Sequence, residues 1–146
     1  MKYKFFIAGR ARNKDNILSI CEIFDELNFS YYCFLKNDET TNSFGQNATN
    51  QEEKMKEFEQ LDLKSDIAEN IFKIDMEAEK KSEKFLLVLP SGTSGHIEAG
   101  VAYGLGKKCY AIGEYDATDS LYNIFDEIYK NKDELKNALK REKEEV

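Results

Sequence analysis

The 146-residue chain has few of the residues that mark disulfide-bonded, metal-binding or membrane-spanning proteins. It contains one proline, one histidine, three cysteines and no tryptophan. Cys21, Cys33 and Cys109 are an odd set without CxxC spacing, which argues against a zinc site and favours buried free thiols in a reducing cytoplasm. The first apolar run stops before Arg10, far short of the roughly 20 residues that span a bilayer. We therefore expect a cytoplasmic protein that does not enter membranes.

Positive charge is also scarce. The chain has 21 Lys and Arg against 28 Asp and Glu, a net charge of −7. Because the basic residues are dispersed, no stripe suits a nucleic-acid polymer or an anionic membrane surface. Hydrophobic residues make up 41% of the chain, which is enough to form a packed core. The length fits one domain, so we expect residues 1–146 to form a single domain that binds small molecules or protein partners.

Short apolar runs alternate with amphipathic stretches along the chain. Aromatic and β-branched residues predict strands at 3–8 and 31–35, and the apolar spacing between them predicts a helix with Asp15 as its N-cap. Residues 85–89 are apolar throughout, which predicts a central strand covered on both faces. A further strand is predicted at 108–112. A strand, helix, strand unit implies parallel pairing with a right-handed connection.

The remaining segments predict a long loop and several helices. The polar stretch 36–53 predicts a mobile flap. Periodic apolar residues predict helices at 67–81 and 121–128, a run of small and apolar residues predicts one at 96–106, and the charged segment 133–146 predicts a surface helix. This order of elements predicts an α/β fold: a doubly wound, flavodoxin- or Rossmann-like parallel sheet of four to five strands flanked by helices.

The loops that follow the first and the central strand are expected to form the binding site. In doubly wound sheets, ligands bind beyond the carboxyl ends of the strands, where the strand order reverses. Gly9, Gly92 and Gly95 allow the backbone to approach a ligand closely. The free N–H groups at the start of the helix near Gly95 and His96 suit a phosphate or another anion.

Glu98 lies about one turn into this helix and should face the mouth of the crevice. It could simply offset the positive end of the helix dipole. It is not part of a capping box, because the residue three positions earlier is Gly95 rather than Ser or Thr. The same dipole would keep Glu98 ionised, and an ionised carboxylate there is suited to attack or stabilise an electron-poor sugar carbon. Both explanations remain open on spacing alone.

One stretch carries a family resemblance. Residues 87–112, LVLPSGTSGHIEAGVAYGLGKKCYAI, together with the N-terminal FFIAGRAR, resemble the nucleoside 2-deoxyribosyltransferase-like superfamily, which is itself similar to TIR-fold NAD-cleaving domains. In that superfamily a central strand and a small-residue loop precede a helix of the form E-x-G-x-A-x-x-x-G-K. The matching residues here are Glu98, Gly100, Ala102, Gly106 and Lys107. The looser resemblance extends over residues 3–130.

The resemblance implies cleavage or transfer at the N-glycosidic bond of a nucleoside or nucleotide, without a metal or other cofactor. Glu98 would attack the anomeric carbon, and the glycosyl group would pass to a base or to water. Asp75, on the helix before the central strand, is the candidate proton donor, with a solvated surface aspartate as the alternative. Family members commonly carry an aspartate just before the central strand, where residues 81–84 read Lys-Ser-Glu-Lys. Related enzymes complete their sites across subunits, which implies a homodimer or a higher homo-oligomer.

Other residues bear on the substrate. Arg10 and Arg12 suit the phosphate of a nucleoside 5′-monophosphate or of NAD, or are solvated surface arginines. Ser94 caps the helix or binds a ribose hydroxyl, and His96 contacts the substrate or has no role. Two other functions remain open: a TIR-like NAD glycohydrolase or cyclase, which would share the glutamate and the fold, and a non-catalytic nucleotide-sensing module.

Overall fold

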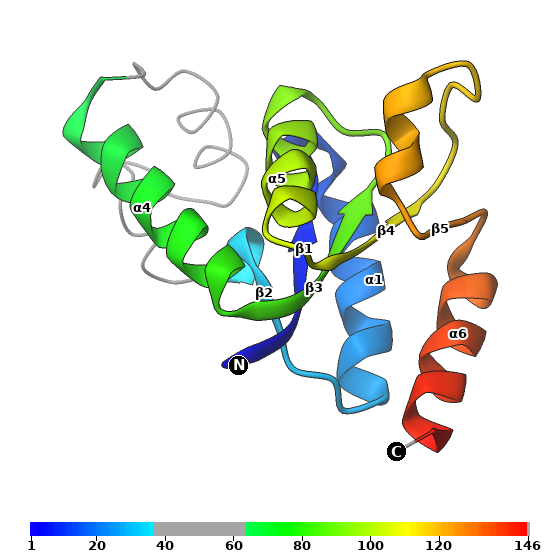
Figure 1. Cartoon of the computed structure of the whole chain (residues 1–146). Helices are drawn as coiled ribbons and strands as arrows, with labels where there is room; N and C mark the ends of the chain where they lie inside the picture. The colour runs from blue at the N-terminus through cyan, green and yellow to red at the C-terminus, as the bar shows by residue number, and fades with distance from the viewer. Residues whose placement is uncertain (37–63, 146) are drawn as a thin grey trace.

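The computed structural model of the chain describes residues 1–36 and 64–145, so nearly all of the predicted flap at 36–53 lies outside the described residues. The described part forms a parallel sheet with helices on both faces (Figure 1). In chain order its strands, α-helices and 3-10 helices (η) are β1 (Tyr3–Ala8), η1 (Ala11–Asn13), α1 (Lys14–Glu26), β2 (Tyr31–Cys33), η2 (Phe34–Lys36), α4 (Asp66–Lys80), β3 (Ser82–Val88), α5 (Thr93–Gly104), β4 (Lys108–Ile112), η3 (Ser120–Ile124), β5 (Glu127–Tyr129) and α6 (Lys132–Glu144).

The strand order is β2-β1-β3-β4-β5, and all neighbouring strands run parallel. β3 is central: its Leu86 lies opposite Ile7 of β1 and Tyr110 of β4. Residues 85–88 are completely buried, as expected of a strand covered on both faces. The order reverses between β1 and β3, because β2 lies on one side of β1 and the later strands lie on the other. The structure therefore confirms the predicted doubly wound α/β fold, with five strands.

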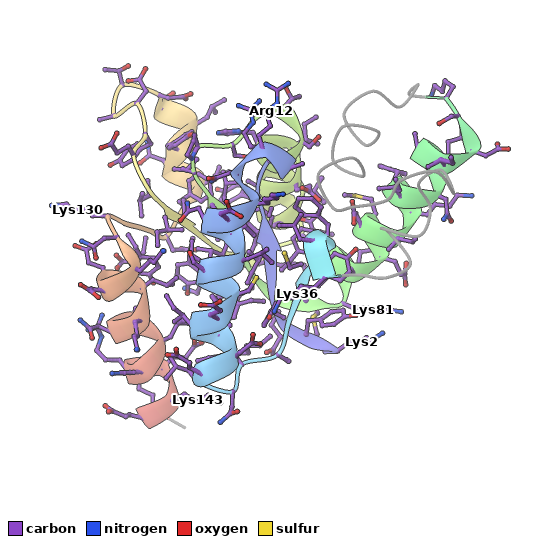
Figure 2. All side chains as sticks on the ribbon, turned by 180° about the vertical axis from the view of Figure 1, so that it is seen from behind. Lys2, Arg12, Lys36, Lys81, Lys130 and Lys143 are labelled. Carbon is purple, nitrogen blue, oxygen red and sulfur yellow. The ribbon has the colours of Figure 1, made fainter. Side chains whose placement is uncertain are left out.

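Alternate residues of each strand face two separate hydrophobic cores. Phe5 and Ile7 of β1 pack beneath α1 and α6, whereas Phe6 and Ala8 pack beneath α4 and α5. Figure 2 views the molecule from the side of α1 and α6, and Figure 1 views it from the side of α4 and α5. α4 and α5 thus share one face of the sheet, so their side chains can approach one another although β3 separates the helices in the sequence.

Two helices begin earlier than the sequence predicts. Asp15 does not cap α1, which begins at Lys14 with Asn13 in the N-cap position. The reason is that η1 leads directly into α1, which leaves Asp15 in the first turn, where its charge still complements the helix dipole. α5 begins at Thr93 rather than His96, because the turn after β3 is already complete at its N-cap, Gly92, which has extended backbone angles.

The predicted helix over 121–128 is wrong. The segment forms the short helix η3 and then the edge strand β5, whose Ile128 lies opposite Ala111 of β4. Leu121 is 75% exposed, so the apolar residues of this segment do not form one buried helical face. The second strand is also shorter than predicted, because β2 ends at Cys33 and the chain continues as η2.

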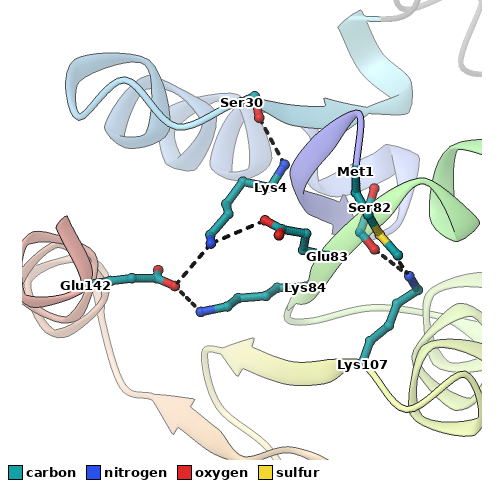
Figure 3. Close-up of polar contacts among 8 residues, drawn as sticks. All are labelled: Met1, Lys4, Ser30, Ser82, Glu83, Lys84, Lys107 and Glu142. Carbon is teal, nitrogen blue, oxygen red and sulfur yellow. Dashed lines mark hydrogen bonds and ion pairs between the residues drawn. The ribbon is translucent and has the colours of Figure 1, made fainter. Parts of the chain in front are cut away.

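α6 occupies most of the charged C-terminal segment and packs on the sheet through only a few side chains. Leu135 and Leu139 are buried against the core beneath α1 and α6. Near the end of the helix, Glu142 forms ion pairs with Lys84 of β3 and, at 4.0 Å, with Lys4 of β1 (Figure 3). These contacts hold the C-terminal end of α6 near the amino ends of β1 and β3.

All three cysteines are buried and free, as their spacing predicts. Within residues 1–36 and 64–145, no helix has the length and apolar composition needed to cross a membrane.

Candidate functional site

The loop after β1 lies at the point where the strand order reverses. A Cβ atom at Gly9 would lie 2.7 Å from Cδ1 of Ile17 and 3.3 Å from the carbonyl oxygen of Val88. Gly9 is therefore buried in a close contact between β1, α1 and β3. Arg10 and Arg12 follow it and are exposed beyond the carboxyl end of β1, where Figure 2 shows Arg12. Both arginines thus lie at the edge of the sheet where ligands bind in folds of this kind.

The first turn of α5 packs tightly against the end of β3 through Gly95, whereas Thr93 and Ser94 on its other side are exposed. A Cβ atom at Gly95 would lie 2.8 Å from Cδ1 of Leu87 and closer still to Oγ of Ser91. The Ser91 hydroxyl is buried without a hydrogen-bond partner among the residues that the structure describes. The N-cap residue Gly92 has no side chain to cap the helix, and Ser94 lies exposed in the first turn, so the capping alternative for Ser94 is excluded. The first turn of α5 retains the free N–H groups that suit an anion.

His96 connects α5 to η3 through hydrogen bonds on both sides of its ring. Its Nδ1 lies 2.8 Å from the carbonyl oxygen of Gly92, and its Nε2 lies 2.7 Å from the hydroxyl oxygen of Tyr122. The two rings also contact each other, with centroids 5.7 Å apart. The protein therefore occupies both nitrogens of His96, and a contact with substrate remains a prediction.

The structure brings the two predicted catalytic residues together between α4 and α5. These helices contact each other on the same face of the sheet. Glu98 of α5 and Asp75 of α4 are half-buried and interact electrostatically. The hydroxyl of Tyr32, at the centre of β2, donates a 2.8 Å hydrogen bond to Oδ1 of Asp75. Asp75 is therefore not a solvated surface residue, which was the alternative explanation for it.

Burial alters the acidity of both carboxyl groups. It raises the pKa of Asp75 to about 6, against the opposing effect of the Tyr32 hydrogen bond. Burial raises the pKa of Glu98 well above its usual value, and the negative charges of Asp75 and Glu79 raise it further. Desolvation and like charges therefore oppose the helix dipole, which was expected to keep Glu98 ionised.

Glu79, a residue that sequence reasoning missed, is the third acid of the cluster. Its side chain is 0% exposed, and neither carboxyl oxygen has a hydrogen-bond partner among the described residues. Burial raises the pKa of Glu79 to about 8, and the positive charge of Lys107 acts in the opposite direction. Its one signal in the sequence is its place four residues after Asp75, on the same side of the helix.

Lys107, the last residue of the superfamily motif, lies at the other end of this cluster. Its ammonium group donates hydrogen bonds to the carbonyl oxygens of Lys80, at 3.2 Å, and of Ser82, the latter drawn in Figure 3. It thus joins the end of α4 to the start of β3 and supplies the positive charge that Glu79 interacts with.

A cavity of about 380 Å³ opens near the carboxyl ends of β3 and β4 but on the opposite face of the sheet. Its lining includes Asn16, Ile20, Leu89, Ile112, Gly113 and the residues 130–133 at the start of α6. None of the residues predicted for catalysis or binding lines this cavity. The candidate site is therefore the carboxyl cluster between α4 and α5, together with the loops after β1 and β3.

Across residues 1–36 and 64–145, no group of three or more His, Cys, Asp and Glu side chains is arranged to hold a metal ion.

The fold is similar to that of a solved structure, a 2-deoxyribosyltransferase from the psychrotolerant bacterium Bacillus psychrosaccharolyticus. The TM-score is 0.64 at 13% sequence identity, and the match covers 91% of this chain and 90% of that chain. This match confirms the nucleoside 2-deoxyribosyltransferase-like fold that the sequence resemblance implied. No protein-family model and no curated protein sequence matches the chain. At this low identity the similarity shows the fold, and the chemistry has to be inferred from the site residues.

Proposed function

We propose that this protein cleaves or transfers the N-glycosidic bond of a nucleoside or nucleotide, with Glu98 as nucleophile and Asp75 as general acid. The observation that carries the proposal is the pairing of these two half-buried carboxyl groups in a fold similar to that of a 2-deoxyribosyltransferase. An enzyme acting on nucleosides is the coarser conclusion that this similarity supports. The choice of sugar, base and acceptor belongs to the proposal.

The reaction would proceed in two displacements. A carboxylate oxygen of Glu98 attacks the anomeric carbon, the bond to the base breaks, and its electron pair leaves with the base nitrogen. Asp75 donates its proton to the departing base. An incoming base or water then attacks the anomeric carbon, returns a proton to Asp75 and frees Glu98. Transfer and hydrolysis differ only in the molecule that enters at this second step.

The electrostatics of the cluster favour this chemistry. A pKa of about 6 allows Asp75 to hold or release a proton near neutral pH. The negative pocket around Glu98 is unfavourable for its own charge, but it favours the positive charge that develops on the sugar in the transition state. The interaction is therefore stronger in the transition state than in the free protein, which is the condition for catalysis.

A phosphate on the substrate would fit beside the carboxyl cluster. Arg10 and Arg12 lie at the switch point, and the first turn of α5 offers uncapped N–H groups behind Gly92. We therefore include a nucleoside 5′-monophosphate and a dinucleotide among the candidate substrates. Neutralising both arginines should weaken binding of the monophosphate more than binding of the nucleoside.

The test is release of free base. The protein is incubated with deoxynucleosides, their 5′-monophosphates and NAD, with and without a second base, and products are separated by chromatography. Glu98→Gln should lower base release at least roughly 100-fold, the scale expected when a catalytic group is removed. Glu77→Gln is the matched control, because Glu77 is an exposed glutamate of α4 paired with Lys81 at 3.5 Å.

Each outcome selects one function. Base exchange indicates a transferase, and base release into water indicates a hydrolase. Nicotinamide release from NAD alone indicates the TIR-like alternative. Binding without turnover, unchanged by Glu98→Gln, indicates a sensing module. Base release that persists in Glu98→Gln refutes the role of Glu98.

We also propose self-association through the exposed side of α5. Ile97, Tyr103 and Leu105 are large apolar residues that are 59%, 58% and 50% exposed, on or just after the helix that carries Glu98. Burial of such a surface is favourable in a homodimer or higher oligomer. Sedimentation should give a mass above that of one chain, and Ile97→Lys should lower it. A single-chain mass at high concentration contradicts this proposal.

A further inference from the structure

Glu79 is unusual because its ionisable side chain is fully buried and makes no hydrogen bond among the described residues. Its exposed fraction is 0%, and neither of its carboxyl oxygens is bonded within the described part of the chain. A carboxylate taken out of water without partners is strongly unfavourable, so such a group either keeps its proton or serves a nearby site. The nearest acids of its surroundings, Asp75 and Glu98, are the two proposed catalytic groups.

The ionisable groups that interact with Glu79 come from its own helix, from α5 and from the segment around the start of β4. Asp75 lies one turn earlier on α4, Glu98 lies on α5, and Lys107 lies in the turn before β4. The thiol of Cys109 on β4 also interacts with the Glu79 charge. The charge of Asp75 thus opposes ionisation of Glu79, the charge of Lys107 supports it, and the charge of Glu79 in turn opposes ionisation of Glu98.

We propose that Glu79 is a positioning residue that does not touch the substrate but, once its buried carboxyl group is ionised, keeps a proton on the catalytic pair of Asp75 and Glu98. This inference rests on the proposed function. Like charges in a poorly solvated cluster repel one another mutually, so Glu79 acts on both groups. Three carboxyl groups in this arrangement titrate as a coupled set and release their protons at separate pH values.

Removal of the Glu79 charge should shift the pH profile of the reaction in a direction that can be measured. The catalytic pair is active when it carries one proton, on Asp75, and one negative charge, on Glu98. Glu79 carries negative charge only in the alkaline range, and there its charge makes the catalytic pair hold its remaining proton to higher pH. Replacing Glu79 by glutamine removes that charge while keeping the size of the side chain. The alkaline limb of the pH profile of kcat/KM should therefore move to lower pH, by on the order of one pH unit, whereas the acidic limb should stay in place because Glu79 is protonated there.

The variants compared are Glu79→Gln, Glu79→Asp and Glu77→Gln. Glu79→Asp retains the charge and should restore the profile toward that of the unaltered protein. Glu77→Gln removes the same charge from the exposed side of the same helix and should leave both limbs in place. A merely structural role of Glu79 would change activity at all pH values equally. Coincident profiles for Glu79→Gln and the unaltered protein would overturn the proposal.

A second measurement requires neither turnover nor a Glu79 variant. The side-chain carboxyl carbons are labelled with ¹³C, and the titration of Glu79 is followed by NMR in the unaltered protein and in Asp75→Asn. We expect the Glu79 midpoint to fall when the charge of its neighbour is removed. Equal midpoints in the two proteins would refute the coupling. If no substrate releases base, the proposed function fails, and the NMR titration still decides whether Glu79 is coupled to Asp75.

Discussion

The buried carboxyl group of Glu79 makes a prediction about stability that is independent of catalysis. Burial raises the pKa of Glu79 from 4.5 to about 8 in the folded protein. A raised folded-state pKa means that the folded state binds this proton more tightly than the unfolded state. Its contribution to stability is therefore fully present below pH 4.5 and is lost progressively as the pH rises through about 8. Above that pH no further loss from this group is expected.

The size of the effect follows from the same shift. A rise of the pKa from 4.5 to about 8 corresponds to a loss of up to about 5 kcal/mol between the two limits. Because a small domain has a total stability of only about 5–15 kcal/mol, this one residue should dominate the alkaline side of the stability profile. Glu79→Gln, which mimics the protonated form at every pH, should be more stable than the unaltered protein at alkaline pH and similar to it near pH 4.5.

The assay is urea unfolding, followed by circular dichroism at a series of pH values from about 5 to about 9. The measured quantity is the change with pH in the gap between the two unfolding free energies, because Asp75 and the other acids are present in both proteins. Glu77→Gln, which removes a surface pair worth only a few tenths of a kcal/mol, is the control and should give a gap that stays small. Parallel curves for Glu79→Gln and the unaltered protein would refute the assignment of Glu79 as a buried, proton-holding carboxyl group.

Three further outcomes are expected. Gly95→Ala should destabilise the fold by about 1–3 kcal/mol in urea unfolding, because its Cβ would lie 2.8 Å from Cδ1 of Leu87, whereas Gly100→Ala has open space and should stabilise α5 by about 0.5–1 kcal/mol. Tyr32→Phe removes a hydrogen bond that lowers the pKa of Asp75, so the alkaline limb of base release should move to higher pH, and an unmoved limb contradicts the contact. All three cysteines are buried, so a thiol reagent should modify them in the unfolded protein and leave the native protein unmodified over the same time.

The parts of the fold that the sequence predicts well are those where local pattern and global position agree. Residues 85–88 of β3 are a run of apolar residues in the central strand, so their composition and their burial carry the same information. α4 shows periodic apolar positions, and Ile71 and Ala78 among them are buried. Strand β5 is different: it has three residues, of which Glu127 is exposed and Ile128 and Tyr129 are half-buried. Its conformation depends on pairing with β4, which no local pattern contains.

The acidity of Glu98, like the conformation of β5, depends on neighbours that the local sequence does not reveal. Spacing alone places Glu98 near the first turn of a helix, where a dipole favours its ionised form. The small residues Gly95, Ala99 and Ala102 are buried against the sheet, so α5 lies close to it and to α4. That close packing encloses the carboxyl group of Glu98 with the acids of a neighbouring helix. The small residues around Glu98 thus influence its acidity as well as the packing of α5. The acids that raise its pKa, Asp75 and Glu79, lie about 20 residues away on α4.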